Sequence, residues 1–296
     1  MAARKSISTL SSSQSISSPT PRVGTASTCL GGKVYLFSGR GGVAMTAIEE
    51  KGSLWTFEHS KSMPSSAPAW TLLSPGDPNA PYPEGRSYHA LTNDGFKTIY
   101  LHGGCPAKGR LSDLWAFDVP TCTWTELTQA PGSGRGGSSI AVSGGRLYRM
   151  NGFDGKTEQG GTLDIYAPDL NTWNSMSYAP DGVSGPEPRS VSCLLAVELQ
   201  GRPSLVTAFG ERGPSPLGHQ GAGKMLSDIW FFDIETSKWS QMEAAEGSTE
   251  RPAARGWFGA DVLRHRGAST DSIVIAGGLD EDNERLSDVW ILGFSE

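Results

Sequence analysis

One loop of the chain, FGERGPSPLGHQGAG, holds the residue types best suited to metal chemistry. Glu211 directly follows a β-rich run, and His219 stands eight residues later among glycines and prolines. A carboxylate and an imidazole are both ligand types that transition metals accept. Two plainer interpretations stay open, because Glu211 can accept hydrogen bonds from loop amides and His219 can be a solvated side chain.

Arg40 and Trp257 depart from the pattern of the rest of the chain. Arg40 directly follows the glycine of FSGRGG, where no other repeat has arginine. Trp257 is the one tryptophan of nine that stands outside the two tryptophan positions recurring along the chain. Both residues therefore merit attention, although a solvated arginine and a tryptophan that caps a channel by packing are the plain alternatives.

Five repeats must position these side chains. Each repeat begins with an arginine among small residues, at Arg22, Arg86, Arg135, Arg189 and Arg255. A β-branched and aromatic run follows and closes on glycine, as in KVYLFSG, TIYLHGG, RLYRMNG, SLVTAFG and SIVIAGG. Such short runs predict strands that end where the chain turns sharply. The recurrence of arginine argues for a structural role, such as bonding carbonyl groups of neighbouring repeats.

A second aromatic run follows in every repeat, as in SDLWAFD and SDIWFFD, and a further tryptophan follows it in the first four repeats. This layout predicts four antiparallel strands per repeat. No long stretch shows the apolar period of 3.6 residues that predicts a helix. With 38 glycines and 19 prolines for turns, the sequence predicts an all-β fold.

The paired glycines, the aromatic residue after them and the later tryptophan resemble the kelch motif over essentially the whole chain. The resemblance implies a β-propeller of five recognisable repeats over residues 22–296, preceded by a flexible segment 1–21. The fifth repeat lacks its last strand, and SISTLSS near the N-terminus is a candidate to close the propeller. Such pairing would remove an exposed sheet edge.

The loop of Glu211 and His219 also resembles the plant specifier proteins, which comprise the epithiospecifier, nitrile-specifier and thiocyanate-forming proteins. GHQGAG, ARGW and LDEDNERLSDVW extend the resemblance. It implies a ferrous iron, Fe(2+), bound at Glu211, position 215 and His219. Ser215 stands where the family has aspartate, and its neutral hydroxyl supplies no charge, so water would complete the coordination.

The specifier resemblance also implies a substrate and the residues that bind it. The substrate would be a small reactive molecule such as a glucosinolate aglucone, diverted toward nitrile formation by the metal with no other catalytic residue. Arg40, Arg86 and Trp257 correspond to substrate-binding positions, and a guanidinium pairs well with the sulfate of such a molecule. Relatives in this family have six blades, so one blade is expected to be missing here.

The alternative function is a kelch propeller that serves as a protein-protein interaction scaffold without catalytic activity. Its long loops, at residues 41–53 and 59–69, would form the contact face. A third interpretation is an inactive relative of the specifier proteins. Loss of Fe(2+) binding on substitution of Glu211 or His219 would distinguish the first function from the second.

Composition limits the partners and the location. The formal net charge of −6, without a basic run, argues against nucleic acid. No stretch approaches the roughly 18 apolar residues of a membrane span. Four cysteines without a CxxC pair fit a reducing compartment, and we expect a cytoplasmic protein. The Ser-rich start is typical of a flexible end and also of a transit peptide.

Overall fold

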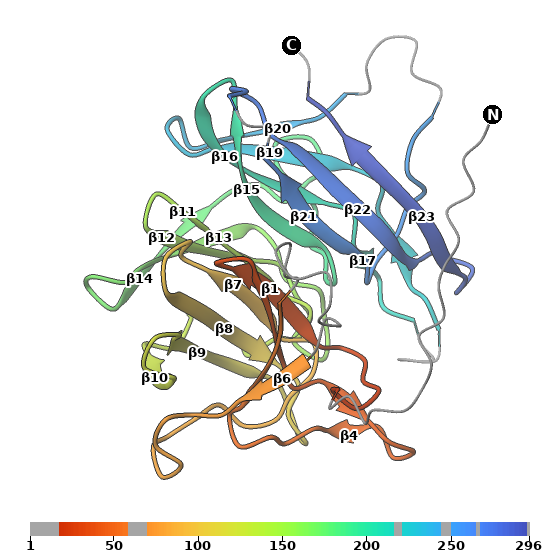
Figure 1. Cartoon of the computed structure of the whole chain (residues 1–296). Helices are drawn as coiled ribbons and strands as arrows, with labels where there is room; N and C mark the ends of the chain where they lie inside the picture. Colours follow the sequence, from red (N-terminus) through yellow and green to blue (C-terminus); the bar gives the residue numbers. More distant parts are fainter. Residues whose placement is uncertain (1–17, 59–69, 216–220, 244–249, 265–266, 295–296) are drawn as a thin grey trace, which may run out of the picture.

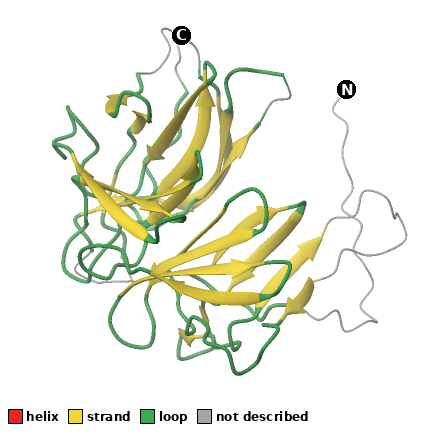
Figure 2. Cartoon of the chain, turned by 90° about the vertical axis from the view of Figure 1, so that its left-hand side faces the viewer, coloured by secondary structure: helices red, strands yellow, loops and turns green. Residues whose placement is uncertain are grey.

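The computed structural model describes residues 18–58, 70–215, 221–243, 250–264 and 267–294, which form strands joined by loops and turns (Figure 1). Figure 2 shows the same strands from the side, with no helix in this part of the chain. The described residues thus include no helix long and apolar enough to cross a membrane. The prediction of an all-β fold is confirmed.

The strands form five antiparallel sheets, the blades, in which strands follow one another in chain order. Blade 1 consists of β1 (Ala26–Leu30), β2 (Lys33–Phe37), β5 (Leu54–Glu58) and β6 (Trp70–Leu73). Blade 2 consists of β7 (Ala90–Asn93), β8 (Thr98–Gly104), β9 (Leu111–Asp118) and β10 (Thr123–Leu127). Blade 3 consists of β11 (Ser139–Ser143), β12 (Arg146–Met150), β13 (Thr162–Ala167) and β14 (Thr172–Ser177).

Blade 4 consists of β15 (Cys193–Leu199), β16 (Arg202–Ala208), β19 (Ile229–Asp233) and β20 (Lys238–Gln241). Blade 5 consists of β21 (Gly259–Leu263), β22 (Ser272–Leu279) and β23 (Arg285–Leu292). The first strands of the blades contact one another in sequence order, from β1 through β7, β11 and β15 to β21, and so form the inner wall of a propeller (Figure 1). The predicted five-bladed kelch arrangement is confirmed.

Two short strand pairs follow the second strand of blades 1 and 4. They are β3 (Arg40–Gly41) with β4 (Thr46–Ala47), and β17 (Glu211–Arg212) with β18 (Lys224–Met225). Each pair is the base of a loop at the same end of its blade, residues 42–45 in blade 1 and residues 213–223 in blade 4. These pairs carry Arg40 and Glu211, two of the residues predicted to serve the site.

Alternating residues of each strand point to opposite neighbours, which explains the apolar composition of the runs. In β8, Ile99 and Leu101 are buried against blade 1, whereas Tyr100 between them is buried against blade 3. Four apolar clusters of this kind lie between blades 1 and 2, 2 and 3, 3 and 4, and 4 and 5. Each fully buried side chain contributes roughly 1.5 to 3 kcal/mol, so the packing between blades is the main source of stability.

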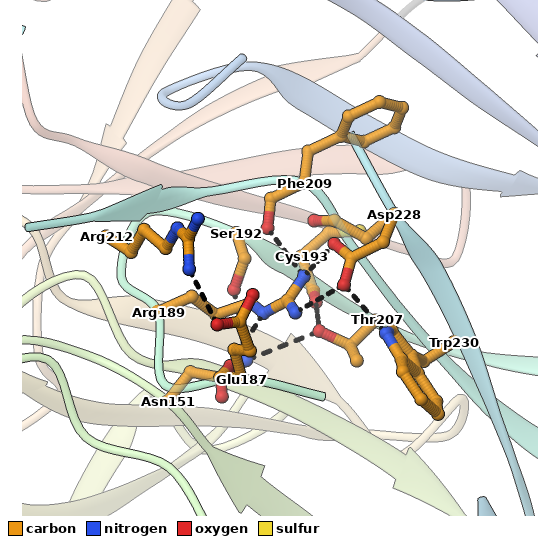
Figure 3. A network of polar contacts seen from close by, with 11 residues as sticks. Asn151, Glu187, Arg189, Ser192, Cys193, Thr207, Phe209, Arg212, Asp228 and Trp230 are labelled. Atoms are coloured by element: carbon orange, nitrogen blue, oxygen red, sulfur yellow. Dashed lines mark hydrogen bonds and ion pairs between the residues drawn. The ribbon is translucent and has the colours of Figure 1, made fainter. Parts of the chain in front are cut away.

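The recurring arginines form buried ion pairs within the blades, and Figure 3 shows the example of blade 4. Arg189 donates to both carboxylate oxygens of Asp228, at 2.6 and 2.8 Å, and to the carbonyl oxygen of Phe209 at 3.1 Å. The indole of Trp230 donates to the same carboxylate at 2.7 Å. The predicted structural role of the arginine is therefore confirmed, but the carbonyl that it bonds lies in its own blade and not in a neighbouring one. The SDxW phrase provides the carboxylate and the indole in blades 2, 4 and 5, and Glu50 provides the carboxylate in blade 1.

Blade 3 departs from this pattern. Its Asp164 is paired at 2.7 Å with Arg149 of β12 instead of with Arg135. Arg149 also donates its Nε proton to Nε2 of His102 in blade 2, at 2.9 Å, so that His102 must carry its own proton on Nδ1. Blades 2 and 3 are thus joined by a buried polar contact as well as by apolar packing.

Blade 5 has three strands among the described residues. Its outermost strand, β23, pairs with β22 on one side, and no described strand pairs with it on the other. The segment SISTLSS, predicted to close the propeller, lies outside the described residues and stays a prediction. The described ring therefore ends in a sheet edge at β23 and in one face each of blades 1 and 5.

Candidate functional site

A cavity of about 920 Å³ opens at one end of the propeller and is lined by all five blades. We call it the mouth. Its wall includes the residue that stands two positions after the recurring arginine in each blade: Gly24, Tyr88, Gly137, Val191 and Trp257. All five have positive φ angles between 48° and 63°, a conformation that turns the chain sharply. The repeat itself thus brings five distant segments to one rim.

Arg40 lies in the wall of the mouth. Its Nε donates to Oγ of Ser87 at 2.8 Å, and its guanidinium carbon lies 5.1 Å from the centre of the Tyr88 ring. The hydrogen bond and the cation–π contact fix the base of the guanidinium. Burial raises the pKa of Tyr88, so its phenol is neutral at physiological pH.

Trp257 lies in the same wall, on the blade 5 side, together with Phe258 and Arg285. The structure therefore brings Arg40 and Trp257 together, although 217 positions separate them in the chain. The backbone amide of Trp257 donates to the carbonyl of Val191 at 3.1 Å, which anchors the strained residue. This bond fixes the backbone from which the Trp257 side chain extends in the wall of the mouth.

The charge of the mouth is positive. Its lining residues include two arginines, Arg40 and Arg285, and neither aspartate nor glutamate is among the described residues that line it. The protein as a whole carries a formal net charge of −6. A cationic cavity on an acidic protein favours anionic groups of a ligand at this place.

His89 lies beneath the rim, where the mouth meets the central channel, a second cavity of about 830 Å³ along the inner strands. Its side chain packs edge-on against Phe37 and is 5% exposed. Burial lowers its pKa to about 3, with a smaller contribution from the charge of Arg86. The ring is therefore neutral at physiological pH.

Arg86 does not line the mouth. It is 1% exposed and is paired at 2.7 Å with Asp113, whose other oxygen accepts from the indole of Trp115. Arg86 also donates to the carbonyl of Gly103 at 3.1 Å. This is the structural arrangement of Arg189, so the site we describe does not include Arg86.

Glu211 begins the loop that was expected to bind iron. It is 7% exposed, and its Oε1 accepts a hydrogen bond from the amide of Gly223 at 2.7 Å. Burial raises its pKa, and the charge of Glu158 adds to the rise. Ser215 is half-buried, and His219 lies outside the described residues. Among the residues described, no group of three His, Cys, Asp or Glu side chains could hold a metal.

Sequence reasoning missed Tyr88 and Arg285 as parts of the mouth. Tyr88 could have been found, because it stands at the same distance from its arginine as Trp257 does from Arg255. Aligning the five repeats at that offset identifies the whole rim. Arg285 gave a weaker signal: it is the first residue of β23 and stands three positions before Asp288 of the SDxW phrase, where only blade 2, at Arg110, also has arginine.

Comparisons with known proteins agree with this architecture. A sequence model of the KLHDC2/KLHL20/DRC7 Kelch-repeats domain matches residues 3–210. The human Kelch domain-containing protein 1 is 32% identical over 114 residues, which are 38% of this chain and 25% of that protein. Tip elongation aberrant protein 3 of Schizosaccharomyces pombe is 29% identical over 147 residues, 47% of this chain and 12% of that protein.

A third relative, acyl-CoA-binding domain-containing protein 4 of Arabidopsis thaliana, is 24% identical over 197 residues, 63% of this chain and 27% of that protein. The chain thus spans about a quarter or less of the length of these relatives. None of the three is named as a specifier protein, so that finer resemblance stays a prediction. On the match over residues 3–210 and the five blades, the chain belongs to the kelch-repeat family of the KLHDC2/KLHL20/DRC7 type.

Proposed function

We propose that this kelch propeller is a protein-interaction module and that its mouth binds an acidic peptide segment of a partner protein. The observation that carries the proposal is the lining of the mouth. Two arginines and the aromatic residues Tyr88, Trp257 and Phe258 surround a cavity without a carboxylate among its described lining residues. Arginine, tyrosine and tryptophan are the residues that most often dominate the energy of protein interfaces.

The position of Arg40 supports recognition of a carboxylate. Its Nε donates a hydrogen bond to Oγ of Ser87. Its two terminal nitrogens are not part of that hydrogen bond and would donate to the carboxylate of a ligand. A hydrogen bond from a guanidinium to a carboxylate contributes roughly 1.5 to 3 kcal/mol, more than a neutral one. The wall of aromatic rings supplies apolar surface for the side chains on either side of the acid.

The size of the mouth and the exposed apolar residues beside it allow an extended peptide to bind. At about 920 Å³ it lies at the upper end of the roughly 300 to 1,000 Å³ common for ligand pockets. The loop between β3 and β4 extends the rim with Met45, which is 46% exposed, and Val43, which is fully exposed. An extended segment can contact the mouth and this rim at once.

Selection of peptides tests the proposal. A phage-displayed library of random short peptides is panned on the purified full chain, and a selected peptide is then synthesised with a fluorophore for anisotropy. We expect enrichment of acidic residues next to an aromatic or aliphatic one. Arg40→Ala should weaken binding of that peptide about tenfold, because one charged hydrogen bond is lost.

Arg146→Ala is the matched control, since Arg146 is exposed in the hairpin between β11 and β12 and does not line the mouth. It should leave the affinity unchanged. Selected peptides without acidic residues, or equal binding to wild type and Arg40→Ala, would refute the proposal.

The iron-dependent, nitrile-specifier-like activity is the second candidate function, and one observation favours it. Glu211 and Glu158 are close enough for the charge of one to act on the other, and Oε1 of Glu158 is buried without a hydrogen-bond partner in the described part of the chain. A divalent cation would compensate both carboxylates. With a single carboxylate pair described, the site as placed lacks the further ligands that iron requires.

Anaerobic calorimetric titration with Fe(2+) tests this second candidate. Stoichiometric binding that is lost in both Glu211→Gln and His219→Ala would support it and would justify assays with a small reactive substrate. Absence of binding, or binding retained in both variants, would remove iron from the account and leave the peptide proposal unaffected.

A further inference from the structure

The recurring arginine of blade 3, Arg135, has no carboxylate partner of the kind that this arginine has in the other blades. The others each pair with a carboxylate at 2.6 to 2.9 Å: Arg22, Arg86, Arg189 and Arg255. In each of them Nε also donates to the carbonyl two positions earlier, at 2.9 to 3.0 Å. Arg135 forms no ion pair with a described residue, and its one hydrogen bond runs from Nη1 to the carbonyl of Asn151 at 3.1 Å.

Arg135 is nevertheless inside the protein. The residue is 5% exposed, and its Nε is buried without a hydrogen-bond partner in the described part of the chain. Burial lowers the pKa of Arg135 to about 10, with a contribution from the charge of Arg149, but this value still leaves the guanidinium ionised at physiological pH. A buried charge without a counter-charge is costly, so this arginine favours the binding of an anion.

Arg149 of β12 is a second buried cation close to Arg135. It is fully buried, and it donates to Asp164 at 2.7 Å and to the carbonyl of Pro131 at 2.9 Å. Its Nη2 is buried, and no described residue accepts a hydrogen bond from it. The equivalent positions of the other blades hold uncharged residues: Leu36, Leu101, Thr207 and Ile275.

The two arginines share one buried carboxylate. Asp164 accepts from Arg149 through Oδ2, and its Oδ1 accepts from the hydroxyl of Ser175 at 2.6 Å. Asp154 also acts on Arg135 through its charge, but it lies in the loop between β12 and β13 and accepts hydrogen bonds from within that loop. The described interior of blade 3 around Arg135 thus holds two cations and one carboxylate.

The loop of residues 130–134 lies close to both guanidinium groups. The carbonyl of Pro131 accepts from Arg149, and a Cβ at Gly132 would lie 3.4 Å from Nη2 of Arg135. Gly132 itself is exposed, so this loop separates the two arginines from solvent. A monatomic anion is small enough to be held under such a loop, whereas the acidic side chain of a peptide would have to displace it.

We propose that Arg135 and Arg149 bind a chloride ion inside blade 3, beneath the loop of residues 130–134. Nε of Arg135 and Nη2 of Arg149 would donate to the ion, so both unpartnered donors would gain an acceptor. The ion would supply the negative charge that Asp228 supplies to Arg189 in blade 4. Neither Arg135 nor Arg149 lines the mouth, so the inference does not depend on peptide binding there.

Thermal unfolding of the full chain in chloride tests the proposal. Sodium chloride replaces sodium gluconate at constant ionic strength, because gluconate is too large for the site and the screening of other charges then stays unchanged. An ion that binds only the folded protein raises the unfolding midpoint by mass action. We expect a rise of about 3 °C for each tenfold increase in chloride above its dissociation constant.

Two variants should each abolish the rise. Arg135→Met removes the unpaired cation, and Arg149→Leu introduces the residue type of Leu101 and frees Asp164 to pair with Arg135. One cation and one carboxylate then remain in either variant. Arg146→Ala is the matched control, because Arg146 is an exposed arginine of the same strand, and it should keep the rise.

Equal midpoints of wild type in chloride and in gluconate would overturn the proposal. A rise retained in both Arg135→Met and Arg149→Leu would also overturn it, because chloride would then act elsewhere on the protein.

Crystals of the wild-type chain grown in sodium bromide locate the ion without any variant. Bromide has the charge of chloride and scatters anomalously, so its position can be measured directly. We expect an anomalous peak within hydrogen-bond distance of Nε of Arg135. Peaks confined to the protein surface would indicate an adventitious ion only, and they would overturn the assignment of the site to Arg135 and Arg149.

Discussion

A buried arginine, a carboxylate and a tryptophan form a unit that blades 1, 2, 4 and 5 share. Arg189 is fully buried, and the side chain of Asp228 is 15% exposed. Although burial alone would raise the pKa of Asp228, the hydrogen bonds from Arg189 lower it below its ordinary value. The unit therefore holds a strand end to the third strand of the same blade and fixes where the loops of the mouth begin.

Asp228→Asn should lower the free energy of unfolding by roughly 3 to 5 kcal/mol, because it leaves the Arg189 guanidinium buried without a counter-charge. Urea unfolding followed by circular dichroism measures the loss. Glu58→Gln is the control, as it removes an exposed pair with Lys33 and should cost about 1 kcal/mol or less. A similar small cost for both variants would contradict the structural role of the buried pair.

His89 gives the propeller a dependence on pH. Its pKa is lowered to about 3 in the folded protein, so the unfolded chain takes up a proton first as the pH falls. Its contribution to stability is complete above the unfolded pKa, about 6.5, and is lost as the pH decreases from there toward 3. His89→Thr introduces the residue type of Thr25, which stands at the equivalent position of blade 1, and it removes the imidazole that titrates.

The free energy of unfolding of wild type should therefore decrease more steeply than that of His89→Thr, by up to about 1.4 kcal/mol per pH unit between about pH 6 and pH 4. Urea titrations at several pH values measure the two slopes. Parallel slopes would show that His89 is protonated in the folded protein.

Within the blades, a glycine stands at or within two residues of the end of the second strand for a geometric reason. Gly39, Gly104, Gly152, Gly210 and Gly278 have φ angles between 102° and 113°. A Cβ at Gly210 would lie 2.7 Å from the carbonyl oxygen of Ser190, in the segment that precedes β15. The sequence predicted a sharp turn at these glycines, and the structure adds the close approach of the neighbouring backbone.

Gly210→Ala should destabilise the protein by about 3 kcal/mol or more, from backbone strain together with the steric contact. Gly201→Ala is the matched variant in the same blade, where φ is also positive but nothing lies within 4 Å of the added Cβ. It should cost only about 1 kcal/mol. Thermal unfolding of the two variants compares them, and equal costs would refute the close approach.

Much of each blade could be predicted from the sequence, because strands and turns follow from local composition. The recurring arginine, the closing glycine and the SDxW phrase are all visible without a structure. The partners of Arg149 could not be predicted, because in blade 3 this arginine pairs with the carboxylate that the recurring arginine binds in the other blades. The path of the loop that begins at Glu211 could not be predicted either, because the length of a loop does not determine its conformation.

At the scale of the whole molecule, the ring is held by contacts between successive blades. In such an array each unit is stabilised mainly by its neighbours. Blade 5 packs against blade 4, and within the described residues its other face has no apolar cluster. Blade 2 is packed on both faces.

The amides of β22 should consequently exchange with solvent faster than those of β8, because blade 5 has one of the two blade interfaces that stabilise blade 2. Hydrogen exchange monitored by mass spectrometry on the full chain measures both strands in one experiment. Equal protection of β22 and β8 would show that blade 5 is as well covered as blade 2, which would contradict the lack of a second packed face seen among the described residues.

The mouth is likewise a property of the whole ring, because Arg40 from blade 1 and Arg285 from blade 5 meet only when five blades assemble. The central claim is that these two cations bind an acidic peptide. The most direct test is the dissociation constant of the selected peptide, measured by calorimetry for wild type and for Arg40→Ala with Arg285→Ala. We predict a loss of about a hundredfold, since each charged contact contributes about a factor of ten. An unchanged dissociation constant would contradict the account.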